Sequence, residues 1–276
     1  MTTVVSIDGT RVDPAHATIS VFDRGLLYGD GCFEVLRTWG GVAVDLRAHL
    51  DRLGETIAVL AIKSLPCDAI AAAVKDAIGA AGAGEHRIRI VVTRGPGSLA
   101  TPLAELGMGH TIVIVEPLSP PVAGITLAVV DWPLPTRLGR GHKTLAYLDH
   151  VMARELARAA GADEGVRLDA TGSVVEGATS NVFVVRGGVV ATPMIEGGVL
   201  PGIVRERVIA ICAGLGIPAE ARRVTLEELR LADEIFATSS LRGVVPVTRI
   251  DGVALPTGPI TTRIATAFVT QMTSTR

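Results

Sequence analysis

The spacing of the apolar residues changes several times along this chain, and these changes limit its fold more than any other feature. The first stretch alternates apolar and polar residues around Asp8-Gly9 and again around Gly40-Gly41, which predicts two β-hairpins. The stretch 46–62 then carries leucine or isoleucine at every third or fourth position from Leu46 to Leu60, which predicts an amphipathic helix. Because strands and helices are mixed without strict βαβ alternation, we predict an α+β protein.

Irregular segments divide the chain into two domains. Prolines and glycine gather at 117–124, and a second irregular stretch follows at 131–142, which indicates a break between structured regions. A long helix is predicted at roughly 144–160, directly after this stretch. Our predicted boundaries are an N-terminal domain at 1–117, an interdomain linker at 118–142 and a C-terminal domain at 143–276.

Composition excludes several classes of protein. With 276 residues, of which 48% are hydrophobic, the chain is too apolar for disorder. Its net charge of −2 gives no excess of positive charge for binding a polyanion, so nucleic acid is not an expected partner. Its apolar runs are too short to span a membrane, and no secretion signal precedes them. The three cysteines, Cys32, Cys67 and Cys212, match no metal-ligand spacing. We expect buried thiols, no metal and a cytoplasmic location.

Two residues could carry chemistry. Lys143 follows the glycine- and proline-rich stretch, and a lysine amine can form a Schiff base with a carbonyl. Taken alone, a lysine in this position is more often a solvated residue at a helix start. Glu176 lies between two strand-like apolar runs. A carboxylate there needs a cationic partner, such as a protonated ring nitrogen, unless it is a surface residue at a strand end.

Phosphate-binding groups are suggested at three places. A helix is predicted to begin just after Gly202, where backbone N–H groups favour an anion. Ser240 follows a predicted strand and adds a hydroxyl donor, and Arg52 on the helix predicted in the stretch 46–62 could add a charge-assisted contact. Each signal is weak alone, because helix starts and helical arginines are usually only structural.

Taken in order, these segments resemble the class IV aminotransferase family, the fold-type IV enzymes that use pyridoxal 5′-phosphate. The resemblance runs from about Ile19 to Ile264. It rests on the stretches FDRGLLYGDGCFEVLR, HLDRL, KTLAYLDHVMARELARAAGADEGVRLDATGSVVEGATSNVFVV, LPGIVRE and ADEIFATSSLRGVVPV. It implies a smaller N-terminal α/β domain and a larger C-terminal domain with a mixed-strand, barrel-like core. It also implies a homodimer.

The resemblance assigns roles to individual residues. Lys143 would be the Schiff-base lysine and would move the proton. Glu176 would pair with the ring nitrogen and Tyr147 with the phenolic oxygen, while Asn181 would support the loop near Glu176. The expected phosphate and ring contacts are Arg52, Leu200, Ile203, Val204 and Ser240. The family often has threonine where Val204 stands and asparagine where Ala146 stands. Neither change removes a residue that the reaction requires.

Substrate contacts are implied at three places. The first holds Tyr28, Phe33 and Arg37, the second is the loop after Arg94, and the third is the turn Ser240-Leu241-Arg242. The second loop, PGSLATP, lacks the arginine and histidine of D-amino-acid aminotransferases. A carboxylate-binding charge could instead come from Arg242, Arg137 or Arg140, each of which is otherwise a surface arginine.

Three functions remain open on the sequence. The leading hypothesis is an aminotransferase that moves an amino group from an amino acid or primary amine to a 2-oxo acid. The second is a 4-amino-4-deoxychorismate lyase that releases pyruvate and 4-aminobenzoate, since DRGLLYGDGCF is close to those enzymes. The third is a non-catalytic member that binds a cofactor or partner, which the presence of Lys143, Glu176 and Tyr147 disfavours.

Overall fold

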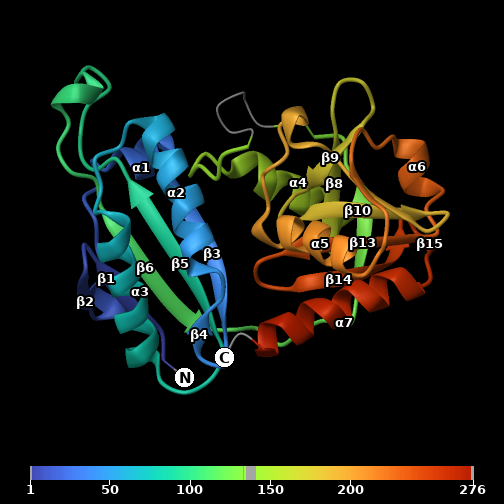
Figure 1. Cartoon of the computed structure of the whole chain (residues 1–276). Coiled ribbons are helices and arrows are strands. Elements are labelled where there is room, and N and C mark those ends of the chain that lie inside the picture. Colours follow the sequence, from blue (N-terminus) through green and yellow to red (C-terminus); the bar gives the residue numbers. More distant parts are fainter. Residues whose placement is uncertain (1, 133, 135–140, 275–276) are drawn as a thin grey trace. The chain divides into compact units, whose positions relative to one another are not determined.

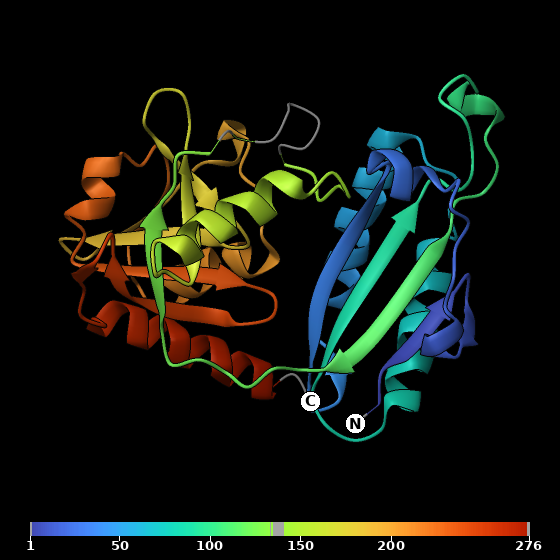
Figure 2. The same cartoon turned by 180° about the vertical axis from the view of Figure 1, so that it is seen from behind.

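The computed structural model describes residues 2–132, 134 and 141–274. It divides into two compact units (Figures 1 and 2). The first comprises residues 1–120 together with 142–147, and the second comprises 121–141 and 148–276. Arg137 and Arg140 lie outside the described residues.

The first unit is a six-stranded sheet with two helices on one face. Its strand order is β2-β1-β6-β5-β3-β4. The strands are β1 (Val4–Ile7), β2 (Thr10–Val12), β3 (Gly31–Trp39), β4 (Val42–Ala43), β5 (His86–Thr93) and β6 (Thr111–Pro117). The helices are η1 (Pro14–His16), α1 (Arg24–Tyr28), α2 (Leu46–Leu60), α3 (Cys67–Ala81) and η2 (Leu103–Glu105). Both predicted hairpins are confirmed, β1–β2 and β3–β4.

Alternation along the central strands decides what each face of this sheet carries. Leu36, Ile88 and Ile90 are buried and pack with apolar residues of α2 and α3 in one core. Side chains one position away point to the opposite face. Phe33 therefore faces away from the helices, and so does Arg89, whose Cα pairs with Val35.

The segment around Lys143 is extended, which differs from our prediction of a helix from about 144. The N–H of Phe33 donates to the Lys143 carbonyl at 2.9 Å, and the N–H of Leu145 donates to the Gly31 carbonyl at 2.9 Å. A Cβ on Gly31 would lie 2.4 Å from the Val92 carbonyl oxygen and 2.6 Å from the Leu145 side chain. Glycine therefore lets this segment pair closely with β3, and α4 begins only at Leu148.

The second unit is built on a nine-stranded sheet of mixed direction. The order β12-β11-β10-β13-β14-β7-β8-β9 ends with β9 lying against β10, so the sheet curls toward a barrel (Figure 2). The strands are β7 (Ile125–Val129), β8 (Glu164–Leu168), β9 (Val174–Gly177), β10 (Asn181–Arg186), β11 (Val189–Thr192), β12 (Ala219–Ala221), β13 (Glu234–Ser239), β14 (Gly243–Ile250) and β15 (Val253–Ala254).

Helices surround this second sheet. They are α4 (Leu148–Ala159), η4 (Ile195–Gly197), α5 (Ile203–Gly214), α6 (Leu226–Arg230) and α7 (Pro259–Ser274). At the start of α6, Thr225 and Glu228 form a complete capping box, as their spacing predicts. Within the described residues, no helix combines the length and apolar character needed to cross a membrane.

Candidate functional site

Lys143 lies in an aromatic and cationic cluster of the first unit. Its Nζ is 4.7 Å from the centre of the Phe33 ring and 5.3 Å from that of Tyr147. The two rings meet edge to face with their centres 5.0 Å apart. Arg89 places its guanidinium carbon 4.4 Å from the Phe33 ring centre. Three predicted site residues therefore lie together, beside an arginine that we did not predict.

Arg89 extends from β5 on the face that carries Phe33. Burial lowers the pKa of its guanidinium, and the neighbouring Arg87 lowers it further. A partly desolvated guanidinium is suited to binding an anionic group. The strand HRIRIVVT alternates polar and apolar residues. This alternation could have identified Arg89 as facing away from the core, but not as a neighbour of Lys143.

Arg52, predicted to contact a phosphate, forms a buried ion pair on the helix-covered side of the sheet. Its Nε and Nη2 donate to the two carboxylate oxygens of Glu34, each at 2.7 Å. His49 Nδ1 also lies 2.7 Å from Glu34 Oε2. Burial alone would raise the pKa of Glu34, but the hydrogen bonds from His49 and Arg52 outweigh it and lower that pKa to about 2. The Glu34 carboxylate thus fixes the plane of the Arg52 guanidinium.

The other predicted substrate residues of this unit have local partners. The Nε of Arg37 donates to the Thr38 carbonyl, and its guanidinium lies over the Trp39 ring. The ring of Tyr28, which is 44% exposed, lies under the guanidinium of Arg24.

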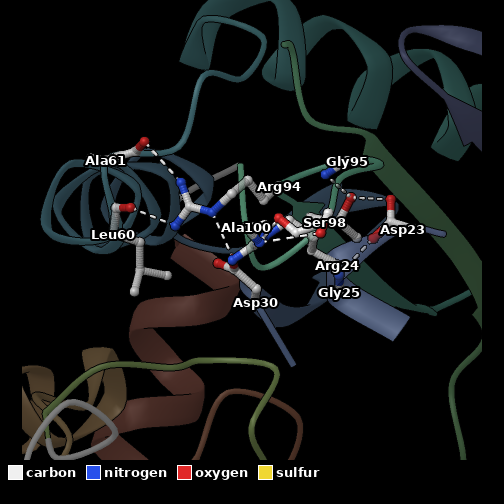
Figure 3. A network of polar contacts seen from close by, with 11 residues as sticks. Asp23, Arg24, Gly25, Asp30, Leu60, Ala61, Arg94, Gly95, Ser98 and Ala100 are labelled. Atoms are coloured by element: carbon white, nitrogen blue, oxygen red, sulfur yellow. Dashed lines mark hydrogen bonds and ion pairs between the residues drawn. The ribbon is translucent and has the colours of Figure 1, made fainter. Parts of the chain in front are cut away.

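A second charged network holds the loop that follows Arg94 (Figure 3). The Nε atoms of Arg24 and Arg94 both donate to Oδ2 of Asp30, at 2.9 and 2.7 Å. Arg94 also donates to the carbonyls of Leu60 and Ala61 at the end of α2. Burial raises the pKa of Asp30, but the two arginines outweigh it, so the pKa is lowered overall. These contacts therefore fix the start of the loop that follows β5.

Glu176 lies in a separate polar cluster within the second unit. It is 8% exposed and stands on β9 directly opposite Arg167 of β8, whose side chain is fully buried. Arg167 Nη2 lies 3.2 Å from Glu176 Oε1. Sequence reasoning missed Arg167, although it is the one charged residue within the apolar run GVRL, in the hairpin that carries Glu176.

The loop between β11 and α5 is tied to this carboxylate. The N–H of Leu200 donates to Glu176 Oε2 at 3.0 Å, and Asn181 Nδ2 donates to the Leu200 carbonyl at 3.0 Å. A Cβ on Gly202 would come within 1.9 Å of Asn181 Oδ1, so a larger residue at 202 would displace the Asn181 side chain. Asn181 is thus placed to support the loop beside Glu176.

The start of α5 offers backbone donors. Gly202 is its N-cap and forms no side-chain capping bond. The first N–H groups of a helix have no partner within the helix, and here no N-cap side chain accepts from them. Ile203 and Val204 open the helix. Ser240 and Leu241 are half-buried in the turn between β13 and β14, and Arg242 is exposed there. In the described part of the chain, no cluster of three or more histidine, cysteine or acidic side chains could bind a metal.

Comparisons with known proteins agree on one family. Residues 31–250 match the model of the family described as amino-transferase class IV. A putative branched-chain-amino-acid aminotransferase of Methanocaldococcus jannaschii is 38% identical over 90% of this chain and 88% of its own length.

Two solved structures match almost the whole chain. The branched-chain aminotransferase of Thermoproteus uzoniensis with norvaline is 33% identical, with a TM-score of 0.93 over 98% of this chain and 95% of its own. The T.th. branched-chain amino acid aminotransferase complexed with N-(5′-phosphopyridoxyl)-L-glutamate is 27% identical, with a TM-score of 0.92 over 99% of this chain and 95% of its own.

Glu34 should contribute pH-dependent stability. Because its pKa is lowered in the folded protein, this stabilisation is complete above the ordinary carboxyl pKa and is lost as the pH falls from about 5 toward 2. We expect Glu34→Gln to lower the free energy of unfolding at pH 7 by about 3–5 kcal/mol and to flatten its fall at acid pH, both measured by urea denaturation. Glu155→Gln, which breaks an exposed pair with Arg158, should cost less than about 1 kcal/mol. Equal losses in the two variants would contradict this.

Proposed function

This chain belongs to the class IV aminotransferase family, and we propose that it uses pyridoxal 5′-phosphate to move an amino group from an apolar amino acid to a 2-oxo acid. The predicted fold-type IV architecture and transaminase activity are confirmed by these matches. The relatives named above support an aminotransferase rather than the lyase that the sequence left as an alternative.

The chemistry of the donor groups fits the proposed cofactor. An ionised carboxylate such as Glu176 suits a protonated ring nitrogen. The N-terminus of α5, where Gly202 provides no capping side chain, suits a phosphate. The Lys143 amine is a partner for the aldehyde group. Tyr147, whose ring adjoins the Lys143 amine, is the proposed partner of the phenolic oxygen.

When bound, this cofactor withdraws electrons from the carbon that loses a proton. Lys143 would bind the aldehyde carbon until the amino group of the donor displaces it. The freed Lys143 amine would then take the proton from the α-carbon of the donor and return it to the cofactor's reacting carbon. Glu176 would hold the ring nitrogen, with Asn181 and Leu200 supporting it. The proposed phosphate contacts are Arg52, Ile203, Val204 and Ser240. Leu241 and Arg242 remain proposed substrate contacts, together with Tyr28, Phe33 and Arg37.

Arg89 is our choice for the residue that binds the substrate carboxylate. It lies in the same cluster as Lys143 and Phe33, whereas Arg242 is exposed and Arg37 lies over Trp39. A guanidinium can bind both oxygens of a carboxylate at once. Phe33 would at the same time present an apolar surface to the substrate.

Branched-chain amino acids are the proposed donors. This proposal is supported by the relatives at 38% and 33% identity, a putative branched-chain-amino-acid aminotransferase and a branched-chain aminotransferase. It is also supported by the apolar Phe33 ring beside Lys143. The donor test below compares L- and D-amino acids and so identifies the preferred enantiomer of the amino donor.

The half-reaction tests this function directly. Protein loaded with pyridoxal 5′-phosphate is mixed separately with L-leucine, L-glutamate, D-alanine, D-glutamate and (R)-1-phenylethylamine, and the visible spectrum is recorded. We expect L-leucine to convert the aldehyde form of the cofactor to its amine form fastest. Lys143→Ala should slow this conversion about 10²–10⁴-fold, whereas Lys75→Ala, at an exposed position on α3, should not. A spectrum that no donor changes would rule out the aminotransferase.

The role of Arg89 can be separated from that of Lys143. Arg89→Leu should lower kcat/KM about 10–100-fold for donors that carry a carboxylate, because a hydrogen bond to a charged group contributes about 1.5–3 kcal/mol. The rate with (R)-1-phenylethylamine, which has no carboxylate, should not fall. Arg87→Leu is the matched control, since Arg87 pairs with Glu116 on β6. An equal loss for both kinds of donor would reject this role.

A homodimer is part of the same proposal. Val21, Phe22, Leu26 and Leu99 are each more than 60% exposed. Their segments are joined, because the N–H of Gly97 donates to the Phe22 carbonyl at 3.2 Å. Figures 1 and 2 show the loop that follows β5 projecting from the first unit. Exposed apolar residues on neighbouring segments favour association with a second copy.

Changing this surface tests the dimer. We expect the unchanged protein to have twice the mass of one chain in light scattering, and Phe22→Asp to shift it toward the monomer because a charge would be buried at the interface. Val253→Asp, at an equally exposed apolar residue on β15, should leave the mass unchanged. A monomeric parent protein would refute the dimer.

A further inference from the structure

The partner of Glu176 inside the protein is a fully buried cation. Arg167 and Glu176 are paired residues of adjacent antiparallel strands, so their side chains leave the sheet on the same face. The guanidinium of Arg167 is wholly removed from solvent. Burying a guanidinium is costly unless an anion compensates it, and the Glu176 carboxylate supplies that charge at 3.2 Å.

The carboxylate is held by different donors on its two oxygens. Oε1 faces the Arg167 guanidinium, and Oε2 accepts the Leu200 N–H. The two donors therefore orient the carboxylate and favour its ionised form.

His150 on α4 also lies beside the Arg167 guanidinium. His150 Nδ1 lies 2.9 Å from the Ala178 carbonyl oxygen and 3.1 Å from Arg167 Nη2. The tautomer of His150 decides whether Nδ1 donates to that carbonyl or accepts from Arg167. With either tautomer, the Glu176 carboxylate accepts from Arg167 Nη2.

We propose that Arg167 is a positioning residue that keeps the Glu176 carboxylate ionised and makes it a weaker proton acceptor for the ring nitrogen of the cofactor. This inference rests on the proposed function, because it is Glu176 that would hold that nitrogen. Arg167 would lower the proton affinity of both Glu176 and the ring nitrogen. It stabilises the negative charge on Glu176, and its own positive charge disfavours a second positive charge on the ring nitrogen.

Removal of the cation should therefore shift two titrations to higher pH. Without Arg167, the Glu176 carboxyl takes up its proton at higher pH, since a buried carboxylate loses its counter-charge. The ring nitrogen also keeps its proton to higher pH, since it no longer faces a fixed cation. A purely structural role for Arg167 would lower stability without moving either titration.

The first experiment uses the protein without cofactor. Glutamate side chains are labelled with ¹³C at Cδ, and Glu176→Gln identifies the resonance of Glu176. We expect the Glu176 titration midpoint to rise by about one pH unit or more in Arg167→Met. It should stay close to the parent value in Arg167→Lys, which keeps the charge, and in Arg158→Met, which removes an exposed arginine of α4.

The second experiment uses the loaded enzyme with ¹⁵N in the pyridine ring. Between pH 6 and 10, the ¹⁵N shift of Arg167→Met should lie closer to the protonated value than that of the parent protein, and Arg167→Lys should restore the parent curve. Identical curves in the parent protein and Arg167→Met would overturn the proposal.

Three controls keep the outcomes distinct. Visible absorbance of the loaded parent protein reports cofactor binding, so its absence would contradict the proposed function and not the Arg167–Glu176 pairing, which the ¹³C titration still tests. Thermal melting of each variant shows whether it folds. If Arg167→Met does not fold, Arg167→Gln provides the uncharged comparison, and an unshifted Glu176 midpoint in that variant rejects the inference.

Discussion

The position of Lys143, the proposed Schiff-base residue, depends on two backbone hydrogen bonds. Residues 143–145 pair with the first residues of β3, through the Lys143 carbonyl and the Leu145 N–H. Alternation then directs the Lys143 side chain to the face that carries Phe33. The rest of the cluster follows from this register, since Arg89 approaches the same ring from the next strand. Gly31 makes the pairing possible because no side chain separates the backbones.

Buried carboxylates recur as the means of fixing arginines in this protein. Glu34 orients Arg52, and Asp30 joins Arg24 to Arg94. Compared with an apolar pair of the same size, such an ion pair adds little net stability, although removing only one partner is costly because it leaves a buried charge unpaired. What they provide is orientation, since a guanidinium bonded through two of its nitrogens cannot rotate. The Glu176–Arg167 pair differs in that its carboxylate, not its arginine, is the group with proposed chemistry.

Features that depend on neighbours along the chain were predictable from the sequence. The helix predicted in the stretch 46–62 is present as α2, which ends at Leu60, and the capping box of Thr225 and Glu228 is present. A helix repeat and a cap depend on residues within a few positions, so both are readable from the sequence. The helix predicted from about 144 was wrong at its start, since pairing with β3 holds 143–145 extended. Arg167 was missed for a related reason, because its partner is set by strand pairing and not by sequence spacing.

The connectivity of the chain has a consequence for dividing this protein. The first compact unit consists of residues 1–120 together with 142–147, so the polypeptide leaves it, enters the second unit and returns before α4. A fragment ending at 120 would lack the segment that pairs with the start of β3 and would expose the edge of that strand. A fragment beginning at 148 would lack the lysine. Neither unit can therefore be separated from the other, or exchanged, by a single cut in the chain.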